Sequence, residues 1–118
     1  MRTPNVVAGD RGEKIARRFL QEHGYEIVDL NYRFGRGEID IVARQNDVLV
    51  FCEVKTRYND AFGAPESALS LRKQEQIRRV ARGYLYEHGI DEQECRFDVV
   101  AIQMSKACAD IRYFPNAF

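Results

Sequence analysis

The first apolar pattern in the chain is that of an amphipathic helix. Asp10 with Glu13 three residues later is a capping pattern for a helix start, and Gly24 suits its end, because glycine readily takes the left-handed conformation that closes a helix. Between these signals, apolar residues recur at three- and four-residue intervals, at Ile15, Ala16, Phe19 and Leu20. This pattern predicts a helix from Asp10 to about His23, preceded by a loose leader over residues 1–9.

The next part of the chain alternates between apolar and polar residues, which is typical of strands. Strands are predicted at Tyr25–Leu30, Glu38–Arg44 and Val48–Lys55. The segment Asn31–Gly37 between the first two is rich in turn-forming residues. Turn chemistry at residues 45–47 separates the second strand from the third, so these two are expected to form a hairpin.

The second half of the chain combines both patterns. Pro65 suits the first turn of a short helix, and Ser70 can cap a longer one that ends near Glu87 and is closed by Gly89. Two last strands are predicted at Cys95–Gln103 and Ile111–Phe114. The order is helix, three strands, helix, two strands, which predicts helices packed on a sheet in an α/β or α+β domain.

Composition narrows the classes of function only a little. The 118 residues suit one domain. No apolar run approaches the roughly 20 residues that span a membrane, and the N-terminus lacks the apolar core of a signal peptide, so we expect a cytoplasmic protein. Eighteen basic residues balance eighteen acidic ones. Nucleic-acid binding must therefore be argued from where the charges lie.

Charged residues that interrupt two strands carry the candidate chemistry. Glu53 and Lys55 end an apolar strand, where charges are not expected, and they project from the same face because side chains alternate along a strand. Asp40 lies on the preceding strand. A two-residue turn at Asn46–Asp47 would place Asp40 directly opposite Glu53, whereas a turn longer or shorter by one residue would put it on the other face.

Two carboxylates facing each other across strands repel, and a divalent cation between them would reverse that effect. Mg²⁺ or Mn²⁺ suits oxygen ligands, typically one or two carboxylates completed by waters and phosphate. Metal held by Asp40 and Glu53 could polarise a phosphoryl group and activate a water. Lys55 could orient that water or stabilise the transition state. The alternative is a solvated ion pair between Glu53 and Lys55.

Three other acidic residues are candidates for the site. Two of them have a structural and a functional interpretation, and the third is assigned a structural role. Glu13 either completes the capping pattern and pairs with Arg17, or reaches a metal from the helix. Glu38 shares a face with Asp40 and is either an additional ligand or a solvated strand end. Asp98 interrupts an apolar strand, and we assign it a structural role, holding a loop or a basic residue by hydrogen bonds.

Basic residues lie at positions that could track a phosphate backbone. Arg33, Arg36 and Arg57 are in loops near the proposed site. Lys73 is on the sheet-facing side of the second long helix, where it could point its charge at a phosphate, with Gln76 beside it. A further cluster is predicted on the opposite face of that helix, at Arg72, Arg79 and Arg82. The alternative for each arginine is an ordinary solvated helix face, and Lys73 could instead snorkel to the end of its helix.

Several motifs together resemble the YraN-like family of bacterial proteins. They are GEKIARRFL from Gly12, GRGEIDIVAR from Gly35, VFCEVKTR from Val50, the helix around Lys73, RFDVVAI from Arg96 and the closing NAF. The resemblance covers nearly the whole chain. It implies a restriction-endonuclease-like, PD-(D/E)xK fold similar to that of Holliday junction resolvases. This is an α/β fold with a central mixed sheet flanked by helices, here one nuclease-like domain over residues 10–118.

The resemblance also implies an activity. In resolvase-like nucleases a helix glutamate, a strand aspartate and an ExK pair form the metal site, and the matching positions are Glu13, Asp40, Glu53 and Lys55. Ile39 stands where the namesake motif has proline. We expect a Mg²⁺- or Mn²⁺-dependent endonuclease acting on branched or single-stranded DNA, and a homodimer by analogy with resolvases. The alternative is a non-catalytic nucleic-acid-binding protein that retains the nuclease fold, because fold does not settle function.

Overall fold

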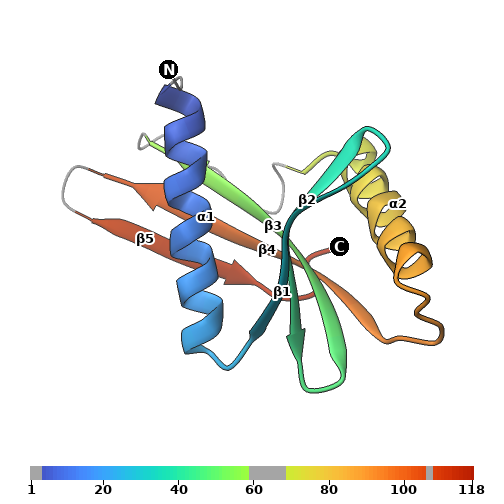
Figure 1. The fold of residues 1–118 in the computed structure, drawn as a ribbon. Helices are drawn as coiled ribbons and strands as arrows, with labels where there is room; N and C mark the ends of the chain where they lie inside the picture. Colours follow the sequence, from blue (N-terminus) through green and yellow to red (C-terminus); the bar gives the residue numbers. More distant parts are fainter. Residues whose placement is uncertain (1–3, 59–68, 106–107) are drawn as a thin grey trace.

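A sheet with one helix on each face makes up the part of the chain that the computed structural model describes, residues 4–58, 69–105 and 108–118 (Figure 1). Its elements are α1 (Pro4–Glu22), β1 (Glu26–Phe34), β2 (Gly37–Gln45), β3 (Val48–Arg57), α2 (Leu71–Glu87), β4 (Cys95–Met104) and β5 (Ala109–Phe114). The predicted order of helices and strands is confirmed. The short helix predicted at Pro65 lies outside the described residues.

The strands lie side by side in the order of the sequence, β1-β2-β3-β4-β5. The β3–β4 pair is parallel and the other pairs are antiparallel. Parallel neighbours need a long crossover, and α2 supplies it between β3 and β4. The sheet is therefore mixed and flanked by helices, as the α/β prediction required. In the described segments, neither helix has the length and apolar character needed to cross a membrane.

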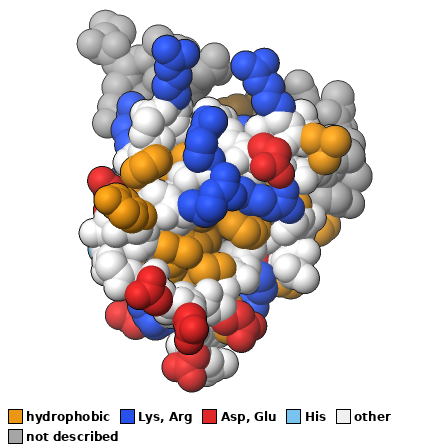
Figure 2. All heavy atoms as spheres, turned by 90° about the vertical axis from the view of Figure 1, so that its right-hand side faces the viewer, with side chains coloured by type: hydrophobic (Ala, Val, Ile, Leu, Met, Phe, Trp, Pro, Cys, Tyr) orange, Lys and Arg blue, Asp and Glu red, His pale blue; other side chains and the backbone are white. Residues whose placement is uncertain are grey.

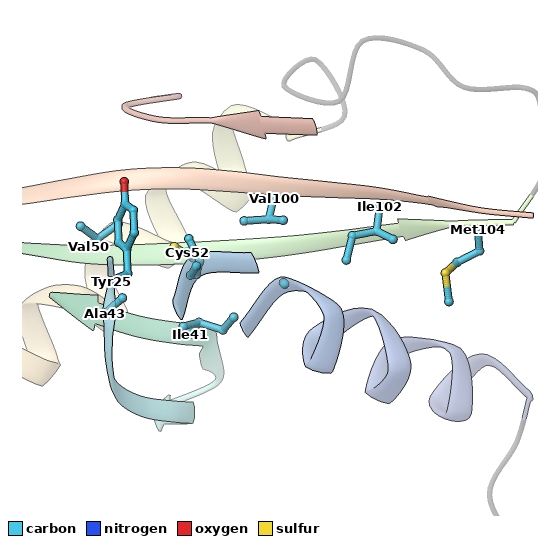
Figure 3. Packing of buried hydrophobic residues seen from close by; sticks show 10 residues of the cluster. Tyr25, Ile41, Ala43, Val50, Cys52, Val100, Ile102 and Met104 are labelled. Carbon is cyan, nitrogen blue, oxygen red and sulfur yellow. The ribbon is translucent and has the colours of Figure 1, made fainter. Parts of the chain in front are cut away.

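Both faces of the sheet are buried, each beneath its own helix. On the α1 face, Ala16 and Leu20 belong to one core with strand residues such as Ile41, Cys52 and Val100. Figure 3 labels the strand residues of this core. On the α2 face, the core consists of Ile39, Val42, Leu49, Phe51, Ile77, Val80, Ala81 and Tyr84. Among the described residues only Glu53 and Asp98 are buried and charged, so each needs a physical explanation.

Asp98 has a structural explanation, as the sequence suggested. Its side chain is completely buried. Arg96 Nη2 lies 3.0 Å from its Oδ2, and the backbone N–H of Asn116 donates to its Oδ1 at 2.8 Å. This carboxylate therefore holds a basic side chain and the C-terminal segment on β4.

The start of α1 differs from the prediction. The helix begins at Pro4, not at Asp10, and includes most of the predicted leader. Proline suits the first turn of a helix because backbone N–H groups there have no acceptor within the helix, so the lack of one costs nothing. Glu13 consequently lies well inside α1, and its interpretation as part of a helix cap is wrong.

The end of β1 also differs. Residues 31–34, predicted as part of a turn-rich segment, continue the strand, and only Gly35 and Arg36 form the turn. The Tyr32 ring packs edge-on against Tyr84, with centroids 5.0 Å apart. Phe34 packs so closely on Gly83 that a Cβ there would lie 2.3 Å from the Phe34 ring. These contacts with α2 override local turn propensity and hold the β1–β2 end against that helix.

Candidate metal site

The connection between β2 and β3 decides where Asp40 lies. Gln45 pairs with Val48, so Asn46 and Asp47 form a two-residue turn, and the same register continues to the pair Ile41–Cys52. Asn46 has φ of 55°, which asparagine tolerates in tight turns. One further step in this register places Asp40 opposite Glu53, so the even-length connection expected from the sequence is confirmed.

The regular pairing of β2 with β3 ends at Ile41–Cys52. Just beyond that pair, Asp40 Oδ2 accepts a hydrogen bond of 2.8 Å from the backbone N–H of Val54. The carboxylate thus takes the role that a strand carbonyl would have in a continued ladder, satisfying a backbone donor. This bond fixes Asp40 at the side of β3, next to Glu53.

Glu53 is unusual because its carboxyl group is buried and its pKa is strongly raised. Its carboxylate is buried, and among the described residues its Oε2 has no hydrogen-bond partner. Burial raises the pKa of Glu53 to about 8, and the neighbouring Asp40 carboxylate adds to the rise. The positive charges of Lys73 and Lys55 oppose it. A buried carboxylate with this much unfavourable energy is what a bound cation would relieve.

The two lysines approach Glu53 from different elements. Lys55 lies two residues further along β3 and is half-buried. Lys73 comes from the first turn of α2, where Ser70 Oγ caps the helix by accepting the Lys73 backbone N–H at 3.1 Å. The Lys73 Nζ lies 3.9 Å from Glu53 Oε2. The cap predicted at Ser70 therefore also sets the position of a charge at the site.

Glu13 approaches from α1. Burial raises the pKa of Glu13, with further contributions from the charges of Asp40 and then Glu38, which places these acids close together. With its amide nitrogen turned towards the acids, Asn31 Nδ2 lies 2.9 Å from Glu13 Oε1 and 2.9 Å from Glu38 Oε1. Asn31 was not among the predicted site residues. It has a left-handed φ of 52°. In the sequence, asparagine at this position indicates only a turn-forming residue.

A glycine next to Glu13 allows α1 to come this close to the sheet. A Cβ on Gly12 would lie 2.0 Å from Thr56 Oγ1 on β3, far inside van der Waals contact. Only a residue without a side chain fits between the helix and this strand. Gly12 therefore sets the distance at which Glu13 is held from the acids of β2.

The arrangement suits a divalent cation, although it is not a preformed cage. In residues 4–58, 69–105 and 108–118, no group of three or more His, Cys, Asp or Glu side chains is arranged to hold a metal ion. Mg²⁺ is usually bound by only one or two carboxylates, with waters and phosphate oxygens in its other positions. Asp40 and Glu53 face each other, and one buried oxygen of Glu53 has no hydrogen-bond partner among the described residues, so the pair fits that requirement.

The predicted nucleic-acid-binding residues fall in different places. Lys73 is at the carboxylates, as described above. Arg33 Nη2 lies 3.3 Å from Glu38 Oε2, and Arg57 is exposed at the end of β3. Gln76 Nε2 donates to the backbone carbonyl of Arg36 at 3.4 Å. Binding of nucleic acid by these five residues stays a prediction.

A solved structure shares the fold. The Holliday junction resolvase Hjc of Archaeoglobus fulgidus matches 89% of this chain and 73% of its own, with a TM-score of 0.51 and 22% sequence identity. At that identity the likeness concerns the fold alone, and it confirms the predicted restriction-endonuclease-like architecture.

Sequence relatives identify the family. UPF0102 proteins of Alkaliphilus oremlandii and Acetivibrio thermocellus are 45% and 47% identical to this chain. The first match covers 97% of this chain and 99% of the relative, and the second covers 88% and 81%. The model of the family described as "Uncharacterised protein family UPF0102" matches residues 12–102. The chain therefore belongs to UPF0102, the YraN family predicted from its motifs.

Proposed function

We propose that this protein is a metal-dependent nuclease that hydrolyses DNA phosphodiester bonds at the site formed by Asp40, Glu53 and Lys55. The observation that carries the proposal is the buried Glu53 carboxylate, which lies beside Asp40 and has one oxygen without a hydrogen-bond partner among the described residues. A structural role would not require two facing acids at this depth. The Archaeoglobus protein that shares the fold is a Holliday junction resolvase, which favours branched DNA as the substrate, with single-stranded DNA as the other candidate.

Each residue has a distinct task in this proposal. Asp40 and Glu53 would hold Mg²⁺ or Mn²⁺, and Glu13, positioned by Asn31, would complete the ligand set. The bound metal supplies a Lewis acid that polarises the phosphoryl group and lowers the pKa of a water. Lys55 would stabilise negative charge that develops on the phosphate, and Lys73 would contact a phosphate oxygen beside Glu53.

Charge at the site makes metal and nucleic acid interdependent. Glu13, Glu38 and Asp40 together repel a phosphate backbone, and Lys55 and Lys73 offset only part of that repulsion. A cation between Asp40 and Glu53 reverses the local sign and also gives the phosphate a ligand position. We therefore expect binding of nucleic acid at this site to require the divalent ion.

Cleavage assays test the proposal directly. The purified protein with Mg²⁺ or Mn²⁺ should cut at least one of a labelled four-way junction, a single strand and a duplex. Asp40→Asn, Glu53→Gln and Lys55→Ala should each reduce the rate by about a hundredfold or more, a loss of about 2.7 kcal/mol or more of transition-state stabilisation. Glu22→Gln, which removes an exposed acid at the C-terminal end of α1, is the control. Cutting that persists unchanged in all three site variants would contradict the proposal.

A non-catalytic nucleic-acid-binding protein is the second candidate. The lack of a complete three-ligand cluster within the described residues favours it. In that case DNA would bind, metal or not, and none of the three substrates would be cut. A Mn²⁺ soak of crystals separates the two candidates further, because the nuclease requires an ion between Asp40 and Glu53.

A further inference from the structure

A cleft on the outer side of α2 is separate from the carboxylates. It is an open cavity of about 660 Å³ lined by Arg36, Arg72, Glu75, Gln76, Arg79 and Arg82. Figure 2, which views the side of the molecule where α2 lies, shows Lys and Arg side chains gathered there. We call this cavity the arginine cleft.

The fold joins two distant parts of the sequence to make this cleft. Arg72, Arg79 and Arg82 lie on one face of α2, whereas Arg36 is in the turn between β1 and β2. That turn is held against α2 by the Gln76–Arg36 hydrogen bond. It is also held by close packing at Gly37, where a Cβ would lie 2.4 Å from a methyl group of Val80. Arg36 is therefore fixed over the helix.

The charges of the cleft are largely uncompensated. Within the described part of the chain, none of its four arginines has an acidic partner within ion-pair distance. Glu75 is the one acid among the described lining residues, and it pairs with Arg78 at 3.1 Å. This concentration of positive charge stands out in a protein whose formal net charge is zero, and it attracts a polyanion.

The chemistry of the lining suits the phosphates of a polyanion. Arginine presents a planar fork of donors that matches phosphate oxygens in pairs. The described residues that line the cleft all have polar or charged side chains, which favours a charged ligand over an apolar one. Arg72 and Arg82 are separated by about 15 Å along the helix axis, which corresponds to roughly four nucleotides of one strand of a duplex. That length exceeds the reach of a single phosphate.

We propose that the arginine cleft is a second nucleic-acid-binding site, which holds the DNA backbone several nucleotides away from the carboxylates. This inference rests on the proposed function for the identity of the polymer. The first turn of α2 links the two sites, because Lys73 contacts Glu53 on the sheet side while the adjacent Arg72 lines the cleft. One strand that passes around this end of α2 reaches both.

Equilibrium binding of fluorescent DNA in EDTA tests the cleft without requiring cleavage. The variant is Arg79→Gln/Arg82→Gln, and the control is Lys14→Gln/Arg18→Gln, which removes the same charge from exposed positions on α1. Each lost phosphate contact lowers the slope of log K against log salt by about 0.7–0.9. The cleft variant should therefore lose about 1.4–1.8 from the slope and about tenfold or more in affinity at low salt, and the control should lose neither.

The outcomes separate this inference from the proposed function. If the wild type never cuts DNA and affinity falls only in the cleft variant, the cleft proposal stands and the proposed nuclease activity is contradicted. A wild type that cuts DNA, with affinity and slope unchanged in the cleft variant, overturns the cleft proposal alone. Equal losses in the variant and the control would also overturn it. So would displacement of DNA by polyglutamate as readily as by an oligonucleotide of equal charge, because that would indicate an acidic protein partner.

Discussion

At the scale of single residues, the charge of the candidate site depends on whether the Glu53 carboxyl group is protonated. Its pKa of about 8 arises from burial first and from Asp40 second. A metal ligand must be deprotonated, so a cation that binds at the proposed site would displace the proton that Glu53 holds at neutral pH. The proposed metal binding should therefore depend on pH in a defined direction.

We expect the affinity for Mn²⁺ to rise with pH and to level off above about pH 8. Calorimetric titrations in buffers of different ionisation enthalpy should show about one proton released per metal at neutral pH. Glu53→Gln should abolish both the proton release and most of the binding, whereas Glu75→Gln should change neither. An affinity that is the same across this pH range would contradict the assignment of Glu53 as a ligand.

The same pKa predicts how pH changes the stability of the metal-free protein. The ordinary pKa of a glutamate is 4.5, and that of folded Glu53 is about 8. The folded state therefore binds more protons between these values, and stability falls as pH rises from about 4.5 through about 8. In EDTA, Glu53→Gln should raise the melting temperature at alkaline pH and lose this advantage near pH 4.5. A constant difference at every pH would show that Glu53 is not the group responsible.

At the scale of elements, the packing of α1 on β3 controls the site. A glycine inside a helix usually costs about 1 kcal/mol of stability relative to alanine, so replacing a glycine by alanine on an exposed helix face usually stabilises a protein. Here the added Cβ would meet Thr56 Oγ1 at 2.0 Å. We expect Gly12→Ala to lower the free energy of unfolding by about 1–3 kcal/mol, as overpacking usually does, and to displace Glu13.

A double-mutant cycle in urea checks this contact. Thr56→Ala removes the oxygen that the new Cβ would meet, so it should restore most of the stability lost in Gly12→Ala, giving a coupling energy of about 1 kcal/mol or more. Thr56→Ala alone is the control. Additive effects of the two substitutions would mean that helix and strand can separate at no cost.

At the scale of the whole molecule, local signals predicted most of the fold. Periodicity predicted both helices and all five strands, and the two-residue turn was sufficient to place Asp40 opposite Glu53, because register in a hairpin is set locally. The extension of β1 through Tyr32 and Phe34 was not predictable in this way, because it depends on contacts with Tyr84 and Gly83.

The remaining parts of the candidate site depend on contacts between elements far apart in sequence. Helical spacing alone left Glu13 between two interpretations, and only the packing of α1 brings it to Asp40. The type of residue at Asn31 indicated only a turn. Its role at the site could not be predicted, because its two acidic neighbours, Glu13 and Glu38, come from different elements. The arginines of α2 were visible as a cluster, but their combination with Arg36 requires the hairpin end to rest on the helix.

The distance between the two proposed sites makes substrate length informative. A short oligonucleotide reaches only the carboxylates, whereas a longer one also occupies the arginine cleft. Contacts remote from the scissile bond bind ground state and transition state alike, so they lower KM and leave kcat unchanged. We therefore expect KM for cleavage to fall as the substrate is lengthened, and this dependence to disappear in Arg79→Gln/Arg82→Gln but not in Lys14→Gln/Arg18→Gln. A kcat that rises with length would instead mean that the cleft acts in the chemical step, and an unchanged length dependence in the cleft variant would place the second contact elsewhere.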